Sequence, residues 1–240
     1  MKPKNFSTIT AILLVGGFGT RLRTVIAEKP KCLAPIKGKP LIYYLLKKLQ
    51  SEGVRKTVLC TGYLAEQVEA EIGAEFPGMS LIYSQENEPL GTGGALRLAL
   101  PKITSDTVLV LNGDSYCEAE YSQFLGEFQR KNANASILLT KVQDSGRFGK
   151  VKTAEDGSII AFSEKTIDDS PGWVNAGIYL MKKKMIVSIP DNGSISLERQ
   201  IFPDWIGRKF FGYKSEGRFL DIGTPASYAE ADRFFCNFPI

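Results

Sequence analysis

The residues best suited to chemistry in this sequence form a glycine-rich loop followed by basic side chains. Gly16, Gly17 and Gly19 end an apolar run, and Arg21 and Lys31 come soon after them. Glycine N–H groups can approach phosphate oxygens closely, and the basic side chains supply the positive charge that a polyphosphate needs. The spacing matches neither a dinucleotide-binding fingerprint nor a P-loop. An ordinary strand-to-helix turn with solvated basic residues stays an alternative.

Two aspartates lie where a divalent cation could be held. Asp114 follows the apolar run 107–111, and Asp221 precedes an expected helix. A carboxylate at a strand end is a suitable ligand for a hard cation, although Asp114 could cap a turn and Asp221 could cap the helix. The sequence contains no histidine, which excludes Ser-His and Cys-His nucleophiles and histidine-bound metals. Reactions that depend on positioning and charge neutralisation, such as nucleotidyl transfer, are favoured.

Alternating strands and helices must position these residues. The apolar patterns predict strands at 9–15, 57–61, 81–83 and 107–111, and helices after Pro40, near Leu64 and from about Gly94. This order implies a doubly wound α/β sheet, in which ligands bind beyond the carboxyl ends of the strands. The glycine-rich loop and Asp114 both follow such ends. Further along, 142–162 predict a hairpin-rich insertion with a turn at Asp156–Gly157, and 173–180 predict another strand.

Length and composition fit one α/β domain of 240 residues with its own core. A formal net charge of +4 is too weak to indicate binding to nucleic acid or to a membrane, and residues 9–15 are too few to span one. The cysteines show no C-x-x-C pair, so neither a zinc site nor a disulfide framework is expected and a reducing cytoplasm is the natural compartment. Cys32, although it lies beside lysines, is expected to be a packed small side chain.

The run 12–40 resembles the sugar-1-phosphate nucleotidylyltransferases. It reads L-V-G-G-F-G-T-R-L at 14–22 and K-P-K-C-L-A-P-I-K-G-K-P at 29–40, close to the family's L-x-G-G-x-G-T-R-L and K-P-K-x-L-x-P-I-x-x-K-P. The resemblance covers nearly the whole chain. It implies a Rossmann-like, mixed and mostly parallel sheet flanked by helices, with a small β-rich sugar-binding insertion. The expected single domain, 1–240, has a nucleotide-binding half over about 1–135 and a sugar-binding half with a C-terminal helix over about 136–240.

The resemblance also implies a reaction and the residues that perform it. A sugar 1-phosphate oxygen attacks the α-phosphorus of a nucleoside triphosphate and expels pyrophosphate, which needs no enzyme base because the phosphate is already anionic. Asp114 and Asp221 would hold the Mg²⁺ cofactor. Arg21 would contact the triphosphate, Lys31 the phosphates near the reacting centre and Lys165 the sugar phosphate. The implied nucleotide-binding residues are Leu14, Gly16, Gly17, Gly19, Thr20, Arg21, Gln85, Pro89, Gly91, Thr92, Asn112 and Gly113, and the implied sugar-binding residues are Gly149, Glu164, Lys165 and Asn175.

Some of these assignments have structural alternatives. Glu164 and Lys165 match the family's F-x-E-K, yet such a pair at a hairpin end is more often a surface feature. Gly149 could be a bulge, and Gln85 could merely end a strand. The stretch 85–96 contains the family's E-x-x-P-L-G-T-x-G-A-L, which runs past the nucleobase and its ribose in relatives. Within it, residues 88–92 resemble guanylyl-, cytidylyl- and some other transferases more than typical thymidylyltransferases.

Within the family, the resemblance favours GTP and D-glycero-α-D-manno-heptose 1-phosphate as substrates. The product would then be a GDP-heptose for bacterial surface glycans such as lipopolysaccharide or capsule. Mannose 1-phosphate with GTP and glucose 1-phosphate with another nucleotide are alternatives, and a non-catalytic nucleotide-sugar sensor is an alternative of another class. The sequence leaves a homo-oligomer open.

Overall fold

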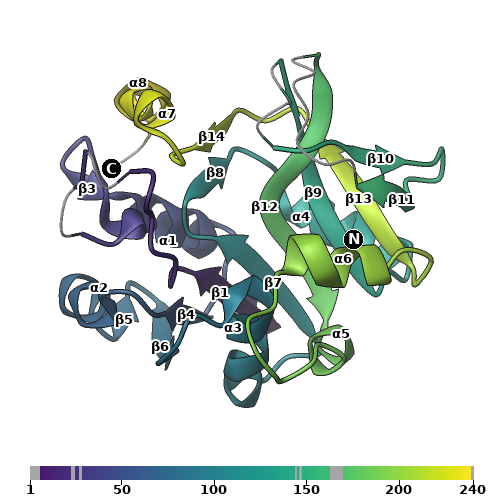
Figure 1. Ribbon diagram of the computed structural model, residues 1–240, viewed down its shortest axis with the longest axis horizontal. Helices are drawn as coiled ribbons and strands as arrows, with labels where there is room; N and C mark the ends of the chain where they lie inside the picture. The colour runs from purple at the N-terminus through teal and green to yellow at the C-terminus, as the bar shows by residue number, and fades with distance from the viewer. Residues whose placement is uncertain are drawn as a thin grey trace.

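An eight-stranded sheet forms the centre of the computed structural model, in the strand order β13-β9-β12-β7-β1-β4-β6-β5 (Figure 1). Its strands are β1 (Thr10–Leu14), β4 (Lys56–Thr61), β5 (Glu75–Phe76), β6 (Met79–Gln85), β7 (Thr107–Asn112), β9 (Ala135–Val142), β12 (Gly172–Lys182) and β13 (Phe210–Ser215). The strands β7, β1, β4 and β6 run parallel, as do β9 and β13, whereas β12 is antiparallel to both its neighbours and β5 to β6. The expected mixed, mostly parallel sheet is confirmed. The structure describes residues 6–22, 25–26, 29–143, 145, 148–162 and 170–238.

Helices cover both faces of this sheet (Figure 1). One face packs against α1 (Leu41–Ser51), α2 (Ala65–Ile72) and α4 (Tyr121–Arg130), and the other against α3 (Gly91–Ala99), α5 (Lys183–Val187) and α6 (Phe202–Asp204). The end of α8 (Ala231–Phe234) packs on α1 and β8 through Phe235. Successive side chains along a strand point to opposite faces, so a central strand that is apolar at every position makes both faces apolar. In β7, Leu109 and Leu111 join the first core, and Val108 and Val110 join the second.

Three short antiparallel pairs lie outside the main sheet. They are β2 (Pro35–Ile36) with β3 (Lys39–Pro40), β8 (Ser115–Cys117) with β14 (Phe219–Asp221), and β10 (Val151–Thr153) with β11 (Ile159–Phe162). The expected turn at Asp156–Gly157 joins β10 to β11. Gly157 has φ +81°, and the Asp156 carboxylate accepts a hydrogen bond from the Ser158 N–H at 2.8 Å. The small β-rich insertion is therefore confirmed.

Several element boundaries differ from those expected. The third strand continues to Gln85, two residues beyond its last strongly apolar position, because its backbone stays paired with β4. Helix α3 begins at Gly91 and not near Gly94, since the Ile195 carbonyl accepts the Gly93 N–H and supports the first turn. The final helix is two short pieces, α7 (Pro225–Ala229) and α8. No helix in the described part of the chain is long and apolar enough to cross a membrane.

Candidate functional site

The glycine-rich loop leaves the carboxyl end of β1 between two other strand ends. Leu14 is in register with Asn112 of β7, and the Leu14 carbonyl accepts the Gly113 N–H at 2.9 Å. A Cβ on Gly113 would lie 2.4 Å from Val15 Cγ1, so no larger residue fits this close approach. The turn after β7 is therefore held directly against the loop, as its expected role with Asp114 requires.

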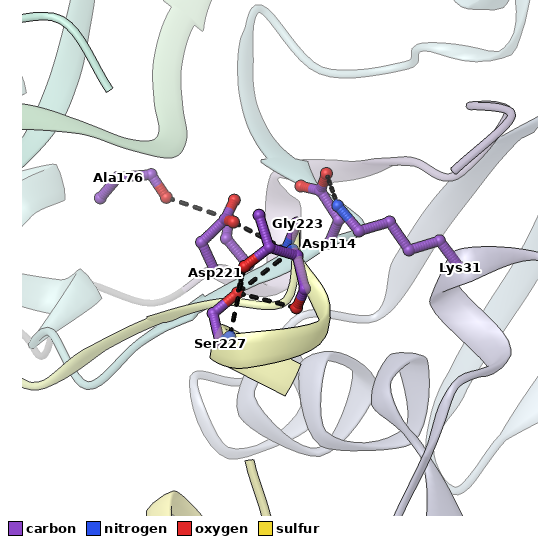
Figure 2. A network of polar contacts seen from close by, with 8 residues as sticks. Lys31, Asp114, Ala176, Asp221, Gly223 and Ser227 are labelled. Atoms are coloured by element: carbon purple, nitrogen blue, oxygen red, sulfur yellow. Dashed lines mark hydrogen bonds and ion pairs between the residues drawn. The ribbon is translucent and has the colours of Figure 1, made fainter. Parts of the chain in front are cut away.

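Lys31 packs beneath the loop. Gly19 has φ +57°, a conformation that favours glycine, and a Cβ there would meet Lys31 Cβ at 3.1 Å. The Lys-Pro-Lys segment forms a 3₁₀ turn, η2 (Lys31–Leu33), in which the Pro30 carbonyl accepts the Leu33 N–H at 2.8 Å. This turn directs Lys31 toward Asp114, and the Lys31 Nζ lies 2.7 Å from Asp114 Oδ2 (Figure 2).

Asp221 reaches the same place from the far end of the chain. In the β8–β14 pair, Asp221 is opposite Ser115, and the Ile222 N–H donates to the Asp114 carbonyl at 3.0 Å. The Asp221 carboxylate accepts the Gly223 N–H at 2.7 Å (Figure 2). The alternative that Asp221 caps the following helix is wrong, because Thr224 forms the capping box of α7.

These segments enclose a cavity of about 580 Å³. It is lined by Gly19, Thr20, Arg21, Lys31, Asp114, Phe148, Asp221 and Gly223. The structure thus brings together both predicted metal ligands and two of the three predicted catalytic cations. Phe148 and Gly223 were not among the predicted site residues. They neighbour Gly149 and Asp221 in sequence, and that adjacency is the only signal that could have found them.

The donor set fits a divalent cation that is bound together with a phosphate. Two carboxylates, Asp114 and Asp221, line the cavity, and within the described residues no group of three or more aspartate, glutamate or cysteine side chains could hold a metal ion by itself. Carboxylate oxygens suit a hard cation such as Mg²⁺, which usually takes one or two protein carboxylates and fills its other positions with water and substrate phosphate.

Another acidic side chain, that of Glu86, lies beside the glycine-rich loop. Its neighbour Gln85 was predicted to bind the nucleotide. Gln85 is exposed at the end of β6. A Cβ added to Gly16 would lie 3.0 Å from Glu86 Oε1, and one added to Gly62 would lie 2.7 Å from it. The carboxylate accepts the Leu90 N–H at 3.2 Å, and partial burial raises its pKa. Glu86 lies in the stretch that the resemblance links to the nucleobase, although Gln85 was the residue predicted there.

The remaining predicted nucleotide residues lie at the start of α3. Gly91 has φ +70°, and its missing side chain admits the Ile195 carbonyl, which a Cβ would meet at 2.5 Å. Thr92 donates its hydroxyl to Glu198 at 3.0 Å and accepts the Leu197 N–H at 2.8 Å. The exposed Pro89 directly precedes this turn. None of these three is among the residues that line the 580 Å³ cavity.

The structure describes two of the four predicted sugar-binding residues, Gly149 and Asn175. Asn175 lies at a bulge of β12, where its amide donates to the Tyr179 hydroxyl at 3.0 Å and its carbonyl accepts the Gly177 N–H at 2.8 Å. Gly149, with φ +79°, follows the cavity residue Phe148. Glu164 and Lys165 lie outside the described residues.

The four cysteines are free thiols. Cys32 is 3% exposed, and burial raises its pKa to about 12. A thiol that stays protonated near neutral pH is a poor nucleophile. The expectation that Cys32 is a packed side chain is confirmed.

Sequence comparison identifies the family to which this geometry belongs. The profile of the nucleotidyl transferase family matches residues 10–237. The chain belongs to this family. Nucleotidyl transferases of this kind generally use a divalent metal ion, in agreement with the carboxylate pair, and the family membership predicted from the sequence is confirmed.

Two curated relatives of this nucleotidyl transferase are each 36% identical to it. One is D-glycero-alpha-D-manno-heptose 1-phosphate guanylyltransferase of Aneurinibacillus thermoaerophilus, aligned over 93% of this chain and 96% of the relative. The other is mannose-1-phosphate guanylyltransferase of Mycobacterium tuberculosis, aligned over 92% of this chain but only 62% of the relative. The crystal structure of HddC from Yersinia pseudotuberculosis has 32% identity and a TM-score of 0.85, covering 95% of this chain and 99% of HddC. HddC has also been solved in complex with GMP-PN.

Proposed function

We propose that this nucleotidyl transferase transfers GMP from GTP to a sugar 1-phosphate, with D-glycero-α-D-manno-heptose 1-phosphate as the preferred acceptor. The convergence of Lys31, Asp114 and Asp221 on one cavity carries the proposal. The name of the full-length relative, heptose 1-phosphate guanylyltransferase, supports the choice of both substrates. The HddC complex with GMP-PN supports a guanine nucleotide.

The proposed reaction is a direct in-line displacement. An oxygen of the sugar 1-phosphate forms a bond to the α-phosphorus of GTP, and the bond from that phosphorus to the pyrophosphate oxygen breaks. The nucleophile is already ionised, so no residue has to remove a proton. The protein's task is to bring two anions together and to neutralise them, which Lys31 and Arg21 can do by charge.

Asp114 and Asp221 are the residues proposed to hold Mg²⁺. When bound, the ion supplies charge neutralisation between the phosphates of the two substrates. The cations Arg21 and Lys31 lie on the loop side of the cavity, and the carboxylates lie at the β8–β14 pair. Charges of both signs therefore line a single cavity, as a site for a metal and two phosphates requires.

Glu86 is the residue that we propose selects guanine. The Watson–Crick edge of guanine presents two adjacent donors, N1–H and the N2 amino group. A carboxylate has two acceptor oxygens and no donor, so it complements that edge. Glu86 lies beside the glycine-rich loop, against Gly16 and Gly62, at the carboxyl ends of the strands where nucleotides bind in such sheets.

Exchanging Glu86 for glutamine tests this selection. A glutamine offers one acceptor and one donor, so it can no longer accept from both N1–H and the N2 amino group of guanine, whereas it complements the N3–H and a carbonyl of uracil or thymine. Glu86→Gln should lower kcat/KM for GTP by about 10-fold or more, an effect of at least ~1.4 kcal/mol, and should raise activity with UTP or dTTP relative to GTP. An unchanged ratio of GTP to UTP activity would rule out base selection by Glu86.

On the sugar side, Gly149, Asn175, Glu164 and Lys165 are proposed to bind the acceptor. The division into a nucleotide-binding half, about 1–135, and a sugar-binding half, about 136–240, is part of the same proposal. We further propose that the enzyme works in the cytoplasm, where its substrates are made and its free thiols stay reduced, with no nucleic acid or membrane partner. Its product would be a precursor of surface glycans.

A substrate panel tests the function as a whole. Five nucleoside triphosphates are combined with heptose, mannose and glucose 1-phosphates in the presence of Mg²⁺, and pyrophosphate release is measured. We expect the highest kcat/KM with GTP and heptose 1-phosphate. A mannose-1-phosphate guanylyltransferase is similar over most of this chain. A preference for mannose 1-phosphate would show that the reaction is as proposed but that the acceptor is mannose 1-phosphate. No release from any pair would indicate a nucleotide-sugar sensor.

A further inference from the structure

One carboxylate, that of Glu198, joins the nucleotide side of the site to the sugar side. It lies in a π-helical turn, η4 (Leu197–Ile201), a rare geometry that often occurs at functional sites. It accepts hydrogen bonds from the hydroxyls of Thr92 at 3.0 Å, Ser196 at 3.0 Å and Tyr179 at 3.2 Å. Thr92 and Tyr179 belong to distant segments, so the carboxylate is a junction between elements and not a local cap.

The chain just before Glu198 holds the start of helix α3. The Ile195 N–H donates to the Leu90 carbonyl, and the Ile195 carbonyl accepts the Gly93 N–H, both at 2.8 Å. Leu90 in turn donates its own N–H to Glu86, the proposed guanine-selecting residue, at 3.2 Å. A shift of this segment would therefore move the backbone that holds Glu86.

The hydroxyl of Thr92 completes this connection. It accepts the Leu197 N–H at 2.8 Å and donates to Glu198 Oε2 at 3.0 Å. Both of these hydrogen bonds join helix α3 to η4. We conclude that this hydroxyl fixes the two elements to each other.

On the sugar side, the connection runs through Tyr179 to Asn175. The buried Tyr179 hydroxyl donates to Glu198 Oε1 at 3.2 Å and accepts from the Asn175 amide at 3.0 Å. Burial and the nearby carboxylate raise the pKa of Tyr179, so the hydroxyl keeps the proton that it donates. The Asn175 carbonyl accepts the Gly177 N–H at 2.8 Å, which fixes the orientation of the amide.

We propose that Glu198 is a positioning residue that couples binding of the nucleotide to binding of the sugar 1-phosphate. This inference rests on the proposed function, because it takes the segment from Glu86 to Thr92 as the nucleotide side and Asn175 as the sugar side. When the first substrate orders the hydrogen-bond network, the network loses conformational entropy. The second substrate then binds with a smaller loss of entropy. Coupling of this kind is reciprocal, so each substrate should raise the affinity for the other by the same factor.

Calorimetric titration of the 240-residue chain measures the coupling directly. The probe is a GTP analogue whose α–β bridge cannot be cleaved, with Mg²⁺, titrated with and without saturating heptose 1-phosphate. For the unaltered protein we expect about fivefold or more tighter binding when the sugar 1-phosphate is present. In Glu198→Gln the ratio of the affinities with and without heptose 1-phosphate should fall close to one. The amide NH₂ cannot accept the hydrogen bonds that one carboxylate oxygen accepts.

Changes at the connected hydroxyls provide matched variants. Thr92→Ser keeps the hydroxyl and should keep the coupling, whereas Thr92→Val removes it and should lose the coupling. Tyr179→Phe should also lose it, because the connection to Asn175 is broken. If Glu198→Gln fails to fold, as judged by thermal unfolding, the Thr92 and Tyr179 variants provide the test.

Two results would overturn the inference. One is an unaltered enzyme that turns over the substrates but shows no coupling, and the other is coupling that survives in Glu198→Gln or Thr92→Val. Failure of the proposed function is a separate outcome, since it would appear as the absence of pyrophosphate release by the unaltered enzyme.

Discussion

Asp114 holds a negative charge in a cavity that also contains Lys31, and the two groups are 2.7 Å apart. Asp114→Asn preserves the shape and an acceptor for Lys31 but removes the charge. We expect kcat to fall by about 100-fold or more, as when one preorganised electrostatic group is lost. Nucleotide affinity measured without metal should change by less than roughly threefold.

The matched control is Asp191→Asn, because the Asp191 side chain is 79% exposed and its nearest cation is 3.9 Å away. It should leave both quantities unchanged. Equal losses of kcat and metal-free affinity in Asp114→Asn would make Asp114 a structural residue.

The role proposed for Glu86 predicts a pH dependence of nucleotide binding. The pKa of Glu86 is raised by partial burial, and only the ionised carboxylate offers two acceptors to guanine. As the pH falls, KM for GTP should therefore begin to rise at a higher pH than an ordinary glutamate would give. Measurement of KM from pH 4.5 to 8 checks this, with Glu86→Gln as the control that should lose this acid limb. A profile shared by both proteins would exclude Glu86 as its source.

At the scale of elements, the bulge in β12 packs closely against the end of β7 and the segment that follows it. Gly177 has φ +74°, and a Cβ there would meet Asn112 Nδ2 and Ser115 Oγ, each at 2.9 Å. Gly193 has nearly the same φ, +75°, with no atom within 4 Å of its Cβ position. Gly193→Ala should therefore cost only the backbone strain, about 1 kcal/mol, whereas Gly177→Ala should cost a further 1–2 kcal/mol or so from crowding.

Urea unfolding of both variants measures the difference in the free energy of unfolding. Equal losses would show that the contacts at Gly177 relax without cost. A larger loss for Gly177→Ala, together with a raised KM for the sugar 1-phosphate, would place the bulge in the acceptor site.

An element could be predicted where its own residues carry a clear pattern, and was missed where it depends on partners far along the chain. Strands β1, β4 and β7 are apolar runs that end at glycines or polar residues, and these runs predicted their positions. The strands β9 and β13 were not predicted. Buried hydroxyl residues such as Ser136 and Thr140 interrupt the pattern of β9, and its partners lie far along the chain.

The same distinction separates the site residues that were predicted from those that were missed. Lys31, Asp114 and Asp221 belong to sequence motifs, and the structure places them in one cavity. Glu86 also belongs to a family motif, but its place against Gly16 and Gly62 is seen only in the structure. Glu198 is recognised by its neighbours in space. Nothing near Glu198 in the sequence indicates that Thr92 and Tyr179 will contact it.

For the whole molecule, an aromatic cluster attaches the C-terminal end of α8 to α1 and β8. Phe235 is 1% exposed, and its ring centroid lies 4.1 Å from that of Tyr44 on α1 and 5.0 Å from that of Tyr116 on β8. Phe235→Ala should reduce the free energy of unfolding by about 3–5 kcal/mol, since a large buried ring leaves a cavity. Phe18→Ala, at a ring that is 46% exposed, should cost less than about 1 kcal/mol. Chemical denaturation compares the two, and equal costs would show that the cluster relaxes around the missing ring.

The pairing of β8 with β14 joins Asp114 to a residue that is made more than a hundred positions later. A growing chain on the ribosome therefore contains the phosphate loop, Lys31 and the first carboxylate long before Asp221 is translated. Until β14 has paired, such a chain lacks one of its two proposed metal ligands. We therefore expect turnover to begin only after nearly all of the sheet has been synthesised.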